Sequence, residues 1–247
     1  MNIRDEHVLR ELNLYPLWVR RSVPDGQVAE PVVEVPAATV IEVQGTAVPA
    51  EAVPALTQVP AAESAADWPA LKQQVHDCTA CKLRAGCTQT VFGVGDEQAD
   101  WLFVGEGPGA DEDAQGEPFV GQAGKLLDNM LAAIKLKRGD NVYIANIVKC
   151  RPPNNRAPEA EEIATCLPYL RRQIELIQPK LIVALGRTAA NALLGRDVPL
   201  GSLRGTLHEY QGIPLLVTFH PAYLLRSPAE KAKAWQDLCR AVAQMRD

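Results

Sequence analysis

Four short apolar runs, separated by segments of helical length, constrain the fold of this chain more than any other feature. The runs do not alternate between apolar and polar positions, as is typical of strands buried on both faces, and they span residues 101–104, 142–148, 181–185 and 215–219. Helical patterns lie beside them at residues 68–76, 122–135, 158–177, 188–194 and 228–245. Strands that alternate with helices pair in parallel through right-handed crossovers. The sequence therefore predicts a three-layer α/β/α sandwich with a central four-stranded parallel sheet.

Glycines and polar residues stand where each predicted strand would end. Residues 105–109 follow the first run, Asn146 lies within the second, residues 186–188 follow the third, and His220 follows the fourth. The carboxyl ends of parallel strands meet at one edge of a sheet, where open α/β folds bind their ligands. We therefore expect a binding site at this edge.

The first quarter of the chain differs in composition from the rest. Residues 1–65 carry four Lys and Arg against nine Asp and Glu, whereas residues 66–247 carry 21 of each. The neutral balance of the second part neither implies nor excludes a nucleic-acid partner. Six prolines between positions 24 and 60 oppose regular structure. We predict a short amphipathic segment at 1–20, which either recruits a protein partner or is dispensable, a disordered tether at 21–66, and one folded domain at 67–247.

The cysteines point to a cytoplasmic metal site. The sequence has no apolar run of 18 residues and no signal-peptide core, so we expect no membrane span and a cytoplasmic protein, where disulfides are rare. Cys78 and Cys81 form a C-x-x-C pair, with Cys150 and Cys166 at wide spacing. A redox dithiol usually opens a helix after a strand, and a zinc site usually offers a second close pair. The spacing favours four thiolates of an iron–sulfur cluster, with zinc and buried thiols as the alternatives.

The chain resembles the family 4 (iron–sulfur) uracil-DNA glycosylases in five successive motifs, from about residue 77 to the end of the last helix. The motifs are the C-x-x-C pair, GEGPGxxED, GEPFVGQAG, NIVKCRPPxNR and HPAYLLR. The resemblance implies the fold of that family and one 4Fe-4S cluster held by Cys78, Cys81, Cys150 and Cys166. Cys87 is the one competitor for a place among these ligands.

The resemblance implies a monofunctional DNA N-glycosylase acting on single- or double-stranded DNA that contains uracil. Such an enzyme flips uracil out of the DNA and hydrolyses the N-glycosidic bond. It releases free uracil and leaves an abasic site for base excision repair. We expect it to act as a monomer.

The same resemblance assigns roles within the substrate pocket. Phe119 stacks on the uracil ring, Asn146 pairs with O4 and N3–H of the base through its carboxamide, and His220 donates to O2 as negative charge develops there. Glycines in the GEGPG motif let the backbone approach the flipped nucleotide closely. The implied substrate-binding set is Gly105, Glu106, Gly107, Phe119, Asn146 and His220.

Water activation is assigned less directly, because Gly107 stands where relatives with the best-known active site carry an aspartate. Among the remaining candidates we expect Glu112, helped by Asn155, to position the water, with Glu106 supporting the loop. Asp111 and Asp113 are expected to be solvated charges or helix caps.

The HPAYLLR motif resembles a loop that enters the DNA minor groove, where apolar wedges fill the hole left by a flipped base. The implied DNA contacts are the wedges Tyr223, Leu224 and Leu225, and the basic residues Arg226, Arg151, Arg156 and Lys149 at phosphates. The alternative places the two leucines in the core of the last helix.

Two other functions compete with catalysis. A binding module could hold uracil-containing DNA without turnover. An iron–sulfur nucleotide-binding or electron-transfer domain would leave Asn146 and His220 at the strand ends unexplained.

Overall fold

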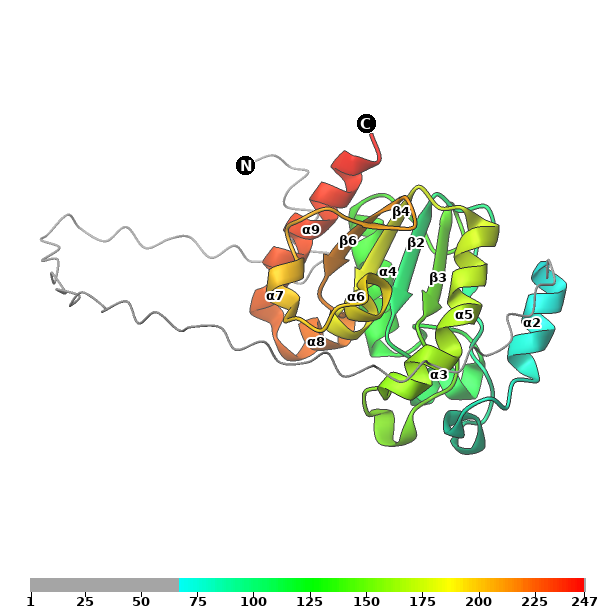
Figure 1. Cartoon of the computed structure of the whole chain (residues 1–247). Helices are drawn as coiled ribbons and strands as arrows, with labels where there is room; N and C mark the ends of the chain where they lie inside the picture. The colour runs from blue at the N-terminus through cyan, green and yellow to red at the C-terminus, as the bar shows by residue number, and fades with distance from the viewer. Residues whose placement is uncertain (1–66, 247) are drawn as a thin grey trace, which may run out of the picture. The chain divides into compact units, whose positions relative to one another are not determined.

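The computed structural model describes residues 67–246, so the predicted segments 1–20 and 21–66 lie outside the described residues. Within them, a six-stranded sheet has the order β1-β3-β2-β4-β6-β5 (Figure 1). Its centre consists of four parallel strands, β3 (Val142–Asn146), β2 (Trp101–Gly105), β4 (Leu181–Leu185) and β6 (Ile213–Thr218). The predicted parallel core is confirmed.

Two short antiparallel strands extend this core at its edges and were not predicted. They are β1 (Val94–Gly95), beside β3, and β5 (His208–Tyr210), beside β6. Strands of two and three residues are too short to give a periodic signal.

The helices that the sequence predicts are present, with small shifts at their ends. They are α2 (Trp68–His76), α4 (Gln122–Ala133), α5 (Ala160–Ile177), α6 (Arg187–Leu194) and α9 (Lys231–Gln244). Three short helices were missed, namely α3 (Ala110–Gln115), α7 (Leu200–Leu203) and α8 (Pro221–Arg226). No helix within residues 67–246 is long and apolar enough to cross a membrane.

Local capping explains where the two best-defined helices begin. The Asp67 carboxylate accepts the N–H of Ala70 at the start of α2. At the start of α5, Glu162 accepts the N–H of Glu159 in a capping box. The predicted start of the last helix at residue 228 is three residues early, because Pro228–Glu230 forms a separate 3₁₀ turn.

The helices cover both faces of the sheet, which completes the predicted three layers. One face packs on α5 and α6, in front of the sheet in Figure 1, through residues such as Leu170 and Ala190. The other packs on α4 and α9 through residues such as Leu131 and Ala241. The central strands are buried along their whole length, except for the first two residues of β6.

The strand order creates a crevice at the carboxyl end of β2. The chain leaves β2 towards β3 on one side and returns to β4 on the other. The segments after β2 and β4 therefore diverge, and open α/β sheets bind ligands where such a reversal occurs.

Candidate active site

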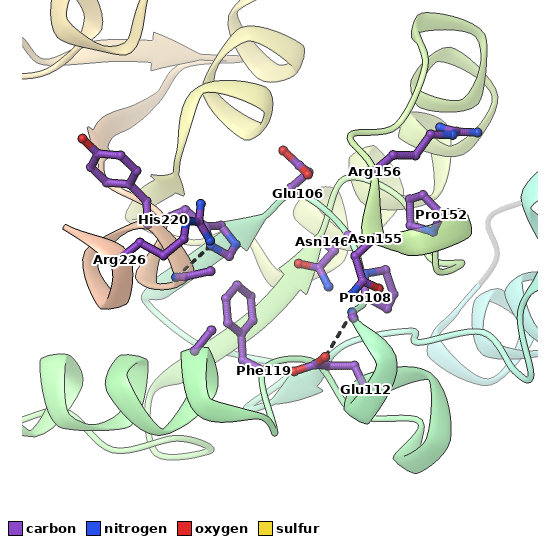
Figure 2. A pocket seen from close by; sticks show the side chains of 15 residues that line it. Glu106, Pro108, Glu112, Phe119, Asn146, Pro152, Asn155, Arg156, His220 and Arg226 are labelled. Carbon is purple, nitrogen blue, oxygen red and sulfur yellow. Dashed lines mark hydrogen bonds between the residues drawn. The ribbon is translucent and has the colours of Figure 1, made fainter.

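A cavity of about 380 Å³ lies at this edge of the sheet (Figure 2), a size typical of small-ligand pockets. It collects most of the site residues predicted from the sequence, although they come from distant parts of the chain. Those that line it are Glu106, Gly107, Glu112, Phe119, Asn146, Asn155, Arg156, His220, Tyr223 and Arg226.

Gly105, the last residue of β2, has no room for a side chain. A Cβ at this position would clash with Asn146 Oδ1 and lie 2.5 Å from Phe119 Cζ. Gly105 therefore lets these two side chains meet beside the strand end. The predicted approach of the glycine backbone to a flipped nucleotide stays a prediction.

Asn146 ends β3 with its side chain 2% exposed. Its Oδ1 has no hydrogen-bond partner among the described residues. An unpaired buried acceptor costs about 1–3 kcal/mol. Because Asn146 also lines the cavity, a ligand donor would find this oxygen unoccupied.

Phe119 lies between α3 and α4, and its ring points into the cavity (Figure 2). Its ring centroid is 5.5 Å from that of His220, at an interplanar angle of 31°. Its φ of 56° lies in the left-handed region, which is uncommon for residues other than glycine. The ring thus forms an apolar wall of the cavity on a constrained backbone.

His220 follows β6 and caps the start of α8. Burial lowers the pKa of its imidazole to about 4, with a smaller contribution from Arg226, while Glu112 opposes the shift. Its Nδ1 accepts the N–H of Ala222 at 3.2 Å. The ring is therefore neutral at pH 7, and its proton resides on Nε2.

Glu112 joins the two glycine-containing segments around the cavity. Its Oε2 accepts the N–H of Gly109 at 3.0 Å, and its Oε1 accepts those of Val120 at 3.0 Å and Gly121 at 3.1 Å. Asn155 also lines the cavity (Figure 2), and its Oδ1 accepts from Arg151 Nε at 2.7 Å. Both predicted water-positioning residues reach the cavity, and Glu112 also organises its loops.

Sequence reasoning placed Thr188 at the end of the third strand but gave it no role. Near the start of α6, its hydroxyl donates to Glu106 Oε2 at 2.5 Å. This bond holds the Glu106 carboxylate in place from the segment that follows β4. The position of Thr188 just after an apolar run was the available signal, but its partner lies 82 residues away.

Asp113 corrects a prediction, because it is buried rather than solvated. It is 4% exposed and accepts the N–H and hydroxyl of Thr88, both at 2.9 Å. It therefore ties α3 to the segment that follows Cys87.

The residues predicted to contact DNA divide into two groups. Tyr223 and Leu225 are 39% and 44% exposed, and Tyr223 stacks on Phe219 with centroids 5.3 Å apart. Leu224 is 1% exposed and packs with Met130 and Leu238. The prediction that Leu224 contacts DNA is wrong, because the helical turn of α8 directs this residue into the core.

Three of the four predicted phosphate contacts are engaged within the protein. Arg156 lines the cavity, but its guanidinium donates to Glu162 through two bonds of 2.7 and 2.8 Å. Lys149 is 1% exposed and donates to the Asn146 carbonyl and to Gln173. A surface role for Lys149 is therefore wrong. Arg151 is bonded to Asn155, as described above, and does not line the cavity.

The four predicted cluster ligands line a second cavity. Cys78 and Cys81 follow α2, Cys150 follows β3, and Cys166 lies on α5. Burial raises the pKa of Cys166 to about 11, and burial also raises that of Cys150. Within residues 67–246, no group of three or more His, Cys, Asp or Glu side chains is arranged to hold a metal ion as it stands. The cluster stays a prediction.

Comparison with known proteins places these features in a family. Residues 92–239 match the model of the uracil DNA glycosylase superfamily. A type-4 uracil-DNA glycosylase of Pyrobaculum aerophilum is 42% identical over 182 residues, covering 70% of this chain and 91% of that protein. Those of Archaeoglobus fulgidus and Thermotoga maritima are 45% and 46% identical, covering 63% and 66% of this chain and 82% and 85% of theirs.

Proposed function

This chain belongs to the type-4 uracil-DNA glycosylases of the uracil DNA glycosylase superfamily, and on that premise we propose how its residues remove uracil from DNA. The enzyme hydrolyses the bond between uracil and deoxyribose in DNA repair. We infer that it is monofunctional, releasing free uracil and leaving an abasic site.

The unpaired Oδ1 of Asn146 is the observation that carries the proposal. A flipped uracil would donate its N3–H to this oxygen and accept the Asn146 amide N–H at O4. Cytosine offers no N3–H and presents an amino group in place of O4, so it would leave buried polar groups unpaired. The Phe119 ring would stack on the bound base, a contact worth about 1–3 kcal/mol.

His220 would stabilise the leaving base. The N-glycosidic bond breaks as the sugar gains positive and the base negative charge, much of it on O2. A neutral imidazole with its proton on Nε2 can donate to O2, and the bond strengthens as charge develops, which favours the transition state over the ground state. The Ala222 N–H donates to Nδ1, and this bond holds the ring in the tautomer that carries its proton on Nε2.

Water positioning is assigned to Glu112 and Asn155, which both line the cavity. Glu112 binds three backbone N–H groups, so its carboxylate is held in place before substrate arrives. Glu106, fixed by Thr188, supports the loop.

One 4Fe-4S cluster would be held by Cys78, Cys81, Cys150 and Cys166, which share a cavity. Its irons would supply the positive charge that lets buried thiols ionise. The four cysteines would thereby join the segment before β2, the segment after β3 and α5 into one unit that supports residues 151–156.

Uracil-containing DNA, single- or double-stranded, would contact the exposed rim of the cavity. Tyr223 and Leu225 suit the role of wedges, and Arg226 lines the cavity mouth. Activity as a monomer stays a prediction. The cytoplasmic location and a partner for residues 1–20 stay predictions.

The proposal is tested with a labelled oligonucleotide that contains one uracil, treated with alkali after incubation with the purified protein. We expect alkali-labile breaks at uracil and none at a matched cytosine, with strong loss in Asn146→Ala and His220→Ala. Binding without breaks would favour the binding module. Iron and sulfide content, with visible absorbance, tests the cluster separately, and a colourless zinc protein would contradict it.

A further inference from the structure

The backbone at Phe119 needs support from elsewhere in the chain. Phe119 adopts a φ of 56°, where a bulky side chain is disfavoured, yet its side chain is 6% exposed and well placed in the cavity. Such conformations persist only where the surroundings impose them. The residues around Phe119 therefore decide where its ring lies.

Arg138, in the turn between α4 and β3, contacts this segment most directly. Its Nη1 donates to the Pro118 carbonyl and its Nη2 to the Phe119 carbonyl, both at 2.7 Å. Its Nε donates to Asp128 on α4 at 3.0 Å. The guanidinium, on a side chain 21% exposed, thus bridges two successive carbonyls while α4 orients it.

The residues that follow Phe119 are held by a negatively charged side chain. Glu112 accepts the N–H groups of Val120 and Gly121, immediately after Phe119. Gly124 in α4 provides space, since a Cβ there would overlap the Phe119 carbonyl oxygen. Phe119 is therefore fixed by a cation at its carbonyls, an anion at the following amides and a close approach to α4.

We propose that Arg138 is a positioning residue for catalysis, acting through the Phe119 ring that stacks on uracil. Arg138 does not line the cavity, so it would not touch the substrate. The inference rests on the proposed role of Phe119. A planar fork of donors suits two adjacent carbonyls, whereas the single ammonium of lysine cannot reproduce both bonds with the same geometry.

The test is a double-mutant cycle on the holoenzyme, measuring kcat/KM for uracil release from an oligonucleotide. We expect Arg138→Ala to lower kcat/KM roughly tenfold to a hundredfold, because small displacements of positioning groups have effects of this size. Arg138→Lys should lie between Arg138→Ala and the unchanged enzyme. In a Phe119→Ala background, Arg138→Ala should cause almost no further loss.

Arg172→Ala is the matched control. Arg172 is a half-buried arginine on α5 that pairs with Glu175 at 2.9 Å, and its loss should change kcat/KM by about twofold at most. Thermal melting checks that each variant folds. If Arg138→Ala melts below the assay temperature, Arg138→Lys takes its place in the double-mutant cycle.

The proposed roles of Phe119 and Arg138 are contradicted by different results. If Phe119→Ala retains full activity, the proposed role of Phe119 fails, and the role of Arg138 fails with it. If Phe119→Ala is impaired while both Arg138 variants are fully active, only the role of Arg138 is overturned. Equal losses from Arg138→Ala with and without Phe119 would also overturn it, because Arg138 would then act by another route.

Discussion

The two loops that bring Phe119 and His220 to the cavity are held in different ways. His220 follows β6 directly, and the helix after it is anchored by Leu224 in the core. The Phe119 segment lies between α3 and α4 and is fixed by hydrogen bonds from Glu112 and Arg138 to its backbone. Apolar burial holds His220 in place, and directional polar bonds hold Phe119.

The difference affects how each loop responds to mutation. Burial spreads its stabilisation over many contacts, and the end of β6 has further support from the Thr218 hydroxyl, which donates to the buried Asp237 at 2.8 Å. Polar bonds to the backbone depend on single side chains. We therefore expect substitutions around Phe119 to impair activity before stability, and those behind His220 to impair stability before activity.

The largest expected effect is at Gly105, where the Phe119 loop meets the sheet. In Gly105→Ala the new methyl group would displace Phe119 and Asn146. We expect kcat/KM to fall about a thousandfold, because uracil would lose both its stacking on Phe119 and its hydrogen bonds to a correctly placed Asn146. Gly201→Ala is the matched control, because a Cβ there has no neighbour within 4 Å. Steady-state kinetics on a uracil oligonucleotide provide the measurement, and full activity of Gly105→Ala would contradict the geometry.

Adjacent leucines in α8 test the His220 side of the comparison. Leu224→Ala removes a core side chain and should lower the free energy of unfolding by about 2–5 kcal/mol. Leu225→Ala, 44% exposed, should leave stability within about 0.5 kcal/mol and weaken activity on duplex DNA more than on single strands. Denaturant unfolding and parallel assays on both substrates measure this, and equal destabilisation by the two variants would refute the assignment.

A smaller effect follows from the half-buried imidazole of His220. Since the pKa of His220 is about 4 in the folded protein and about 6.5 when unfolded, only the unfolded state takes up this proton between those values. Stability should therefore fall as the pH drops from 7 to 4, by up to about 3 kcal/mol from this residue. Unfolding free energies of the native protein and His220→Gln across this range measure it, and a constant difference between them would contradict the shift.

Sequence reasoning located the cavity because its main residues follow strands, and strands were recognisable. Asn146 and His220 were found in this way and through family motifs, whereas Phe119 was found through its glycine-rich motif alone. The bonds of Arg138 and Thr188 were missed because their partners lie about 20 and 82 residues away in sequence, and no periodicity records such bonds.

The errors at buried charges and at Leu224 have a related cause. Lys149 and Asp113 carry charge, which predicts exposure, but partners such as Gln173 and Thr88 satisfy them inside the fold. Leu224 and Leu225 have the same chemistry, and only the rotation of a six-residue helix decides which one is buried. Side-chain partners and helix rotation require coordinates.

The most direct test of the base-binding cavity is a crystal structure of the holoenzyme with its DNA product and free uracil. The account predicts the uracil ring stacked on Phe119, its N3–H donating to Asn146 Oδ1, and its O2 facing His220 Nε2. Uracil bound outside this cavity, or inside it with Asn146 Oδ1 still unpaired, would contradict the account.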